Sequence, residues 1–328
     1  MFKTKKIDFT NFKRLANPLF LIMFIYLVLY TISVIFPLAW GFMSSFKERE
    51  DFASNSIFAF PDFSYWDLNK GYEQFKGYDH PFGNYSLIIT DSTIEASSAY
   101  YRGFKLDILV ERHVVLNIGD YILNTLLYAV ASSAIKTFSP MIVAYLCSKY
   151  KSAFTEFLHA FVIFVMVTPI IGATTSALNL ARQLGLYDNW AGTFIRAINF
   201  TGMYFLVFYG FFESASDTYK EAAEIDGASH FSIMVTIYFP LARVMFSTVL
   251  LLTFVQAWND YNTSLMWLPT HLTLAYAIYH FAYYGASNKS SDPFRIAATM
   301  FLAIPILTLF IIFKKKLMGN LSLGGIKE

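Results

Sequence analysis

Long apolar runs dominate the pattern of this chain. Six of them reach roughly the 17–25 residues that an α-helix needs to cross the hydrocarbon core of a bilayer. They cover Pro18–Trp40, Tyr121–Cys147, Phe157–Ala177, Ala191–Phe212, Ile237–Ala257 and Ile296–Phe313. The sequence therefore predicts an all-α integral membrane protein with about six transmembrane helices.

The first run follows a basic segment, which is also the arrangement of a secretory signal peptide. The apolar region of a signal peptide spans only about 7–15 residues, whereas Pro18–Trp40 is long enough to cross a bilayer. This length favours a retained first helix.

Basic residues between the runs indicate an orientation. They gather in the amino-terminal segment, at Lys149 and Lys151, at Lys220 and Arg243, and at Lys314–Lys316. All these positions share one side if the helices alternate, so the positive-inside rule predicts that both termini are cytoplasmic. The expected parts are a cytoplasmic amino terminus (1–17), helix one (18–43), an extracytoplasmic loop or small cap (44–119), a core membrane region with helices two to six (120–318), and a cytoplasmic tail (319–328).

The loop at 44–119 is too long for a simple connector. Within it, Tyr85–Thr90 and Lys105–Val110 have the composition of short strands. The loop is either a docking surface for another protein or an inert lid over the helix bundle, since exposed aromatic residues suit binding but also suit packing against a membrane surface. The residues alone leave both interpretations open.

Composition narrows the classes of function. Hydrophobic residues make up 56% of the 328 positions, charged residues only 15%, and the net charge is +2. No basic run is long enough to bind a nucleic-acid backbone. The single cysteine, Cys147, has no partner for a disulfide or a zinc site, and no phosphate-binding loop or catalytic signature occurs, so we predict no catalytic and no metal-binding residues.

The most informative segment is the predicted cytoplasmic loop 214–241. Thr218 and Glu221 have the spacing of a capping box, which predicts a short helix that begins near Thr218. Gly227 supplies a left-handed residue at which this helix ends. A second short helix is expected from about residues 228–229, with Pro240 near the first turn of helix five. Such a helix-turn-helix could fill a groove on a partner protein or rest on lipid headgroups.

This loop resembles a known family motif. Glu221-Ala222-Ala223, Asp226-Gly227-Ala228 and Pro240-Leu241 are similar to the EAA loop of binding-protein-dependent ABC transporter permeases. The similarity to the six-helix maltose-type sugar permease extends from about residue 117 to the end, through Asn124-Thr125 opening helix two, Ala144-Tyr145, Pro169, Leu184-Gly185-Leu186, Trp258-Asn259-Asp260 and Gly324-Gly325-Ile326-Lys327. Glu328 departs from the final glycine that is usual in the family.

The resemblance implies the type I ABC importer permease fold and a role in carbohydrate uptake, with an oligosaccharide as the expected substrate. The implied ATPase-coupling residues are Glu221, Ala222, Ala223, Asp226, Gly227, Ala228 and Pro240, and the implied ATPase-interface tail is Gly324, Gly325, Ile326 and Lys327. The implied partners are a second homologous permease, a cytoplasmic ABC ATPase dimer and an extracytoplasmic solute-binding protein, in a bacterial cell membrane. No cofactor is expected in this chain, because ATP and Mg²⁺ would be bound by the ATPase.

Four polar residues within or beside the apolar runs are candidates for the transport pathway: Lys136, Arg196, Asn259 and Asp260. An ionisable group inside a membrane costs at least about 2.5 kcal/mol unless it finds water or a partner. Lys136 and Arg196 could pass an anionic or hydroxyl-rich solute, or could make structural hydrogen bonds. Asn259 and Asp260 could gate the pathway or cap the end of helix five.

Two other classes of protein remain as alternatives. A membrane-embedded enzyme acting on sugar or lipid-linked substrates would need paired acids in one cavity, whereas the acids here fall on opposite sides of the membrane. An ion-coupled secondary transporter would use Lys136 as a relay and would need no ATPase.

Overall fold

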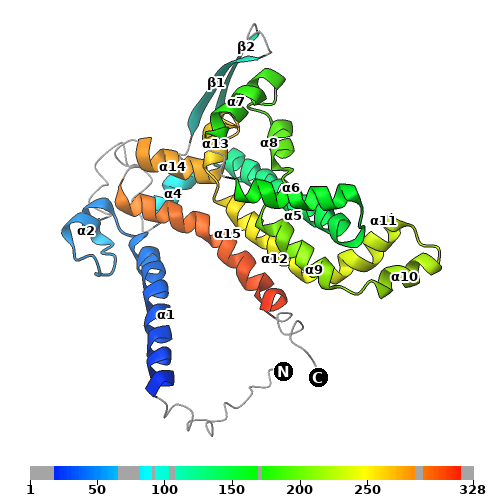
Figure 1. Ribbon diagram of the computed structural model, residues 1–328. Helices are drawn as coiled ribbons and strands as arrows, with labels where there is room; N and C mark the ends of the chain where they lie inside the picture. The colour runs from blue at the N-terminus through cyan, green and yellow to red at the C-terminus, as the bar shows by residue number, and fades with distance from the viewer. Residues whose placement is uncertain are drawn as a thin grey trace. The chain divides into compact units, whose positions relative to one another are not determined.

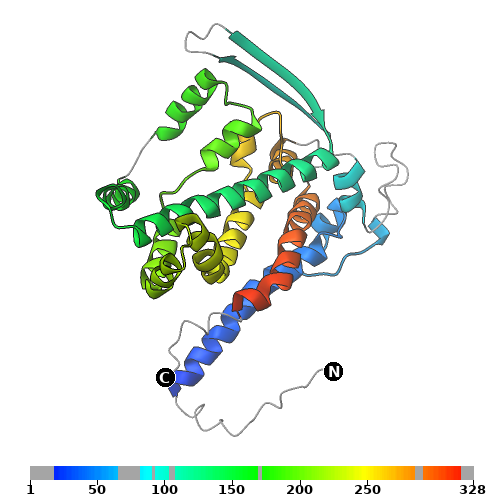
Figure 2. The same cartoon turned by 90° about the vertical axis from the view of Figure 1, so that its right-hand side faces the viewer.

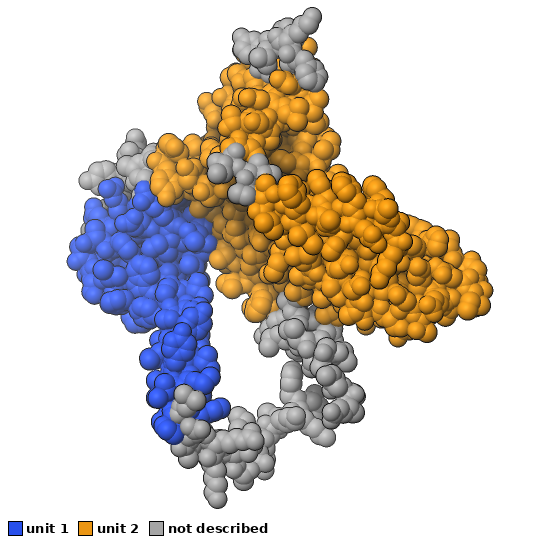
Figure 3. Space-filling view, in the orientation of Figure 1, with its two compact units in different colours: residues 1–87, 287–300 blue, residues 88–286, 301–328 orange. Residues whose placement is uncertain are grey.

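The computed structural model describes residues 18–65, 82–90, 93–102, 108–168, 172–284 and 291–318. The chain divides into two compact units, which Figure 3 colours separately: residues 1–87 with 287–300, and residues 88–286 with 301–328. The long loop expected at 44–119 is therefore shared between the units.

Helices dominate the chain (Figure 1). In chain order the elements are α1 (Pro18–Ser44), α2 (Arg49–Ser54), α4 (Gly83–Thr90), β1 (Ile94–Arg102), β2 (Ile108–Leu116), α5 (Ile118–Lys149), α6 (Ala153–Val167), α7 (Ala173–Leu184), α8 (Trp190–Ala197), α9 (Met203–Ser214), α10 (Thr218–Ile225), α11 (His230–Ile233), the π-helix η4 (Met234–Tyr238), α12 (Phe239–Trp258), α13 (Asn262–Met266), α14 (Leu274–Tyr284) and α15 (Asp292–Met318).

Within the described residues, four helical stretches are long and apolar enough to cross a membrane: Phe20–Ser44, Ile118–Lys149, His230–Trp258 and Asp292–Phe313. They correspond to four of the six predicted spans. The prediction that 157–177 and 191–212 are single helices was wrong, because each of these runs is divided between two helices.

Local sequence accounts for both interruptions. Thr168 ends α6 with extended backbone (φ −81°, ψ 115°), as expected for a residue that precedes a proline. Pro169 itself lies outside the described residues. Between α8 and α9, the Asn199 side chain accepts hydrogen bonds from the backbone N–H and hydroxyl of Thr201 (2.9 and 2.7 Å), and Gly202 has φ 132°. This local turn competes with a continuous helix.

Of the two strand predictions for the long loop, one was wrong and the other is confirmed for the residues that the structure describes. Tyr85–Thr90 lies in helix α4, where Leu87 and Ile88 are buried. A short apolar run does not distinguish a strand from a buried helix, and packing decided this case. Of Lys105–Val110, residues 108–110 open strand β2, and residues 105–107 lie outside the described residues. Its partner β1 was missed, because its inward positions include the small residues Ala96 and Ser98.

In the first unit, α1 is apolar on all sides, and its most hydropathic window has no residue buried within the protein, which suits contact with lipid. The segment after α1 is held by polar contacts. Asn84 donates its amide hydrogens to the carbonyls of Ser45 and Lys47 (both 2.9 Å), and the Ser45 and Tyr85 hydroxyls lie 2.7 Å apart.

In the second unit, α5 packs against α9 and α12 (Figure 2). Large aromatic side chains from α5, α9 and η4 fill the core near the carboxyl end of α5; the fully buried ones are Tyr145, Phe205, Phe208, Phe212 and Tyr238. At the amino end of α5, strands β1 and β2 form an antiparallel hairpin in the register Ile94↔Leu116 to Arg102↔Ile108. The two ends of this 32-residue helix are ~48 Å apart at 1.5 Å per residue.

Candidate functional site

The loop that resembles the EAA motif forms the predicted helix-turn-helix. Helix α10 ends at Ile225, and Gly227 adopts φ 77°. The N–H of Gly227 donates to the Glu224 carbonyl (3.1 Å) and the N–H of Ala228 donates to the Ala223 carbonyl (2.9 Å). These two bonds define a Schellman turn, which requires a left-handed residue at the position of Gly227.

The predicted capping box at Thr218 and Glu221 was wrong. Asp217 occupies the N-cap position, and its side chain makes no capping hydrogen bond. Its carboxylate instead accepts a hydrogen bond from the Lys149 ammonium (2.7 Å) at the end of α5. A tertiary ion pair has thus replaced a local cap.

The second short helix begins where the sequence predicts it, but it is not separate from helix five. Ser229 caps α11 by accepting a hydrogen bond from the Ser232 N–H (3.2 Å). From α11 the chain continues through the π-helix η4 into α12, and Pro240 lies in the first turn of α12. Since proline cannot donate an N–H, the wider π turn just before it shifts the bonding pattern and keeps the helix unbroken from His230 to Trp258.

The base of this element is fixed to the bundle. The buried Lys149 ammonium donates to the Ala215 carbonyl (2.6 Å) as well as to Asp217. Lys220 donates to the Lys149 carbonyl (3.0 Å), and the Tyr238 hydroxyl donates to the Ser216 carbonyl (3.2 Å). The hydrogen bond from Lys149 is the main cause of a lowered pKa for Asp217.

The two faces of the element differ. Ala223 and Ala228 pack against the buried aromatic core, so their small side chains let α10 and α11 approach the bundle. Glu221, Ala222 and Asp226 are exposed. Three large side chains are exposed beside them: Tyr219 (54%), Ile225 (87%) and Phe231 (71%). Sequence patterns alone did not predict that these three side chains are exposed, and their position next to the motif was the available signal.

The predicted pathway residues are largely brought together by the fold. The Asp260 carboxylate accepts hydrogen bonds from the hydroxyls of Tyr128 (2.7 Å) and Thr263 (2.6 Å), and Arg196 donates to the Thr263 hydroxyl (3.3 Å). Lys136, half-buried on α5, is within electrostatic range of both Asp260 and Arg196. Tyr128 and Thr263 are members of this cluster that sequence reasoning missed.

The end of helix five also shows capping contacts. Asp260 accepts a hydrogen bond from the Thr263 N–H (3.1 Å), and Asn259 donates its amide to the Val255 carbonyl (2.9 Å). Asn259 therefore does not join the charged cluster through these contacts. Both residues have the structural bonds expected of caps, and a gating role for Asn259 and Asp260 stays a prediction.

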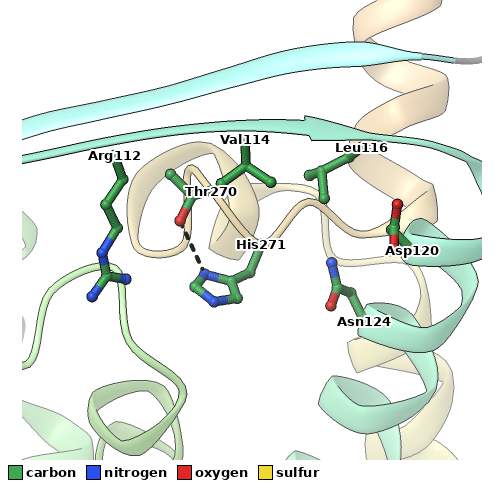
Figure 4. Close-up of a pocket in the computed structure, with 7 residues that line it drawn as sticks. All are labelled: Arg112, Val114, Leu116, Asp120, Asn124, Thr270 and His271. Carbon is green, nitrogen blue, oxygen red and sulfur yellow. Dashed lines mark hydrogen bonds between the residues drawn. The ribbon is translucent and has the colours of Figure 1, made fainter.

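A cavity of about 260 Å³, here called the outer pocket, lies at the amino end of α5 (Figure 4). Its lining residues come from β2, α5 and the segment between α13 and α14: Arg112, Val114, Leu116, Asp120, Asn124, Thr270 and His271. The pocket is on the same side of the second unit as the hairpin, at the other end of α5 from α10.

Asp188 organises one wall of the outer pocket. Its side chain is fully buried and accepts hydrogen bonds from the Thr270 N–H (3.1 Å) and hydroxyl (2.8 Å). His271 Nδ1 lies 3.5 Å and Arg112 3.7 Å from its carboxylate oxygens. Burial alone would raise the pKa of Asp188, but the contacts with His271 and Thr270 outweigh burial and lower it. Sequence patterns gave no signal for this residue.

Two further expectations from the sequence concern the carboxyl-terminal tail and metal binding. The predicted interface tail, Gly324–Lys327, lies outside the described residues. Among the residues that the structure describes, no three His, Cys, Asp or Glu side chains are grouped so that they could hold a metal ion.

Comparison with known proteins identifies the family and the fold of this chain. Residues 137–321 match the family described as binding-protein-dependent transport system inner membrane component. The chain is 27% identical to the maltodextrin transport system permease protein MalD of Streptococcus pneumoniae over 75% of this chain and 85% of that protein. It is 25% identical to the diacetylchitobiose uptake system permease protein NgcG of Streptomyces coelicolor, over 91% and 86%. Its fold is similar to a chain in the crystal structure of a bacterial ABC transporter involved in the import of the acidic polysaccharide alginate (TM-score 0.66, 18% identity, 94% and 99% covered).

The family match covers more than half of the chain, so the protein belongs to the inner membrane components of binding-protein-dependent transport systems. It has the type I ABC importer permease fold and is a transport subunit, not an enzyme. The family resemblance expected from the sequence is confirmed. A membrane-embedded enzyme and an ion-coupled transporter are no longer needed to explain the chain.

Proposed function

We propose that this chain is one permease subunit of an ATP-driven importer for an oligosaccharide, and that α10 and α11 dock on a cytoplasmic ATPase dimer. ATP and Mg²⁺ are bound by that ATPase and not by this chain. A second homologous permease completes the translocation pathway, and an extracytoplasmic solute-binding protein delivers the sugar. Both termini are cytoplasmic in the cell membrane.

The observation that carries the proposal is the form of the helix-turn-helix. Its inner face is tied to the bundle through Lys149 and Tyr238, whereas its outer face presents Tyr219, Ile225 and Phe231 to solvent. Exposed apolar residues next to acidic ones suit a groove on a partner protein. Glu221, Glu224 and Asp226 at the rim are unfavourable for contact with anionic lipid headgroups.

The unbroken helix gives this docking surface a mechanical connection to the pathway. The stretch from His230 to Trp258 has 29 residues, which is ~44 Å at 1.5 Å per residue. Asp260 and its polar cluster follow directly at the far end. A movement of α11 by the ATPase would therefore be carried along α12 to the charged cluster without an intervening loop.

The substrate class rests on relatives. MalD and NgcG are named for maltodextrin transport and diacetylchitobiose uptake, and a further relative, SugB of Mycobacterium tuberculosis, for trehalose transport (26% identity). All three names specify a carbohydrate built from more than one sugar residue. The match with NgcG extends over 91% of this chain, so the same class of substrate is the simplest expectation here.

To test this function, the tagged chain is purified from its native host, co-purifying proteins are identified, and ATP hydrolysis is measured with and without Gly227→Pro. Proline fixes φ near −65°, so it cannot adopt the φ of 77° at this turn. Ala153→Pro is the matched control, because Ala153 is the first residue of α6, where proline is tolerated.

The expected result is recovery of a second permease and an ATPase, with assembly or coupling lost only in Gly227→Pro. Uptake of maltodextrin, diacetylchitobiose, trehalose and raffinose into proteoliposomes with the binding protein then tests the substrate class. A complex without an ATPase would refute the coupling role, and an active ATPase complex that moves none of these sugars would refute the substrate class alone.

A further inference from the structure

The outer pocket is built from polar side chains whose positions are set by the fold. Arg112 donates to the Asp188 carbonyl (2.7 Å), and the His271 ring nitrogen Nδ1 lies 3.2 Å from the Thr270 hydroxyl. Asn124 donates its amide to the Leu272 carbonyl (3.1 Å). Arg112, His271 and Asn124 are thus each held by a contact with a neighbouring residue and also line the cavity, where Figure 4 draws them.

The chemistry of the lining is mixed. Arg112 supplies N–H donors, Asp120 and the carbonyl of Asn124 supply acceptors, and His271 has a second ring nitrogen besides the one that contacts Thr270. Val114 and Leu116 add an apolar wall. A sugar residue has the complementary character, because its hydroxyl groups both donate and accept hydrogen bonds while its ring carbons are apolar.

The charge and the volume of the pocket further restrict the class of ligand that it can bind. Arg112 lies 3.7 Å from the buried carboxylate of Asp188, which offsets its charge, and Asp120 adds a negative group. The pocket therefore has no excess of positive charge with which to select an anion. Its volume of about 260 Å³ lies just below the range of about 300–1,000 Å³ that is usual for pockets that enclose a whole drug-sized ligand. One residue of a longer chain fits better than a complete oligosaccharide.

We propose that the outer pocket is a subsite for one residue of a neutral oligosaccharide, occupied at the extracytoplasmic mouth before the sugar reaches the cluster around Asp260. This inference rests on the proposed function, which supplies the substrate class and the orientation. The extracytoplasmic position follows because the pocket and the ATPase-docking helices lie at opposite ends of α5.

Strand β2 offers a matched pair of positions for the test. Val114 lines the pocket, whereas the adjacent Val115 is 65% exposed and projects to the opposite face of the strand. The single native cysteine, Cys147, is buried on α5. Val114→Cys and Val115→Cys therefore each introduce one accessible thiol into an otherwise protected background.

The experiment measures the rate at which a water-soluble methanethiosulfonate reagent modifies each variant in the reconstituted complex. The probes are maltodextrin, diacetylchitobiose, trehalose and raffinose, with sorbitol at equal osmolarity as the control. Occupancy slows modification by the factor 1 + [L]/Kd, which is about tenfold at ten times Kd. Free sugar should protect the cysteine at 114 and leave the one at 115 unchanged.

A second pair of variants does not depend on thiol chemistry. Val114→Trp fills the pocket and should reduce sugar uptake without loss of the ATPase from the complex, whereas Val115→Trp should behave like wild type. Equal labelling of Val114→Cys with and without a sugar that the complex transports would overturn the proposal. So would protection of both cysteines, or protection by sugar-free binding protein alone, which would make the pocket a protein-docking site.

Failure of the proposed function is read from a different measurement. If the complex lacks an ATPase or transports none of the sugars, the uptake and hydrolysis assays show it directly. If the complex transports sugar but Val114→Trp has no effect, the importer function stands and the outer subsite is rejected.

Discussion

Replacement of Gly227 by alanine isolates the contribution of the turn between α10 and α11. Gly227 has φ 77°, and a Cβ added there would meet no atom within 4 Å. The cost of the substitution therefore comes from the backbone alone. For a residue with a Cβ, the left-handed conformation costs roughly 1–2 kcal/mol.

This cost sets the size of the expected effect. A change of one or two kcal/mol alters the ratio of two conformations by a factor of about 5–30. If the ATPase binds only the turned form, its affinity for Gly227→Ala should fall by up to that factor, because the competent fraction is reduced. Gly227→Asn should lose less, since asparagine adopts the left-handed conformation more readily.

The assay is titration of the purified ATPase onto the chain in lipid nanodiscs. Gly210→Ala is the control, because Gly210 lies inside α9 and an added Cβ also meets no atom within 4 Å. Alanine in a helix interior is favoured over glycine by roughly 0.5–1 kcal/mol, so this variant should bind normally. Equal affinities for Gly227→Ala and Gly210→Ala would show that the turn does not govern docking.

Three further predictions concern stability and pH. Asp188→Asn keeps a residue that tolerates the observed φ of 51° but removes the buried charge, so the free energy of unfolding should fall by about 1–3 kcal/mol. A thiol-reactive dye that labels the buried Cys147 on unfolding should report a lower Tm. An unchanged Tm would contradict this prediction. Tyr128→Phe removes a hydroxyl 2.7 Å from the Asp260 carboxylate and should lower the free energy of unfolding by about 1.5–3 kcal/mol, measured with the same dye. The same change at an exposed tyrosine of α1 should leave the Tm unchanged. Because the pKa of Asp217 is lowered, its pairing with Lys149 stabilises the loop above the ordinary pKa of aspartate and is lost as pH falls through the lowered value. Since Asp217 is exposed, this pairing stabilises the loop by only about 0.2–1 kcal/mol. Protease cleavage of the loop should therefore become faster in acid. Lys149→Met should remove that pH dependence.

The sequence alone determined the features that depend on local chemistry. A continuous apolar run predicts a spanning helix because backbone groups in lipid must bond within their own segment. The described residues contain four such helices. The turn at Gly227 was also predictable, because few residues other than glycine tolerate its φ of 77°. The spacing of residues 221–228 carried the family resemblance, which residues 137–321 confirm.

Only the tertiary structure decided which distant residues meet. Tyr85–Thr90 has a composition that suits either a strand or a helix, and burial of Leu87 and Ile88 selected the helix. Asp217 left its expected local role because Lys149, 68 positions away, offered an ionic partner. Asp188 is 82 positions from Thr270, and no periodicity in the chain encodes that contact. Hydrogen bonds and ion pairs of this kind depend on distances in space, which the folded packing of α5, α8 and α12 creates and local sequence does not contain.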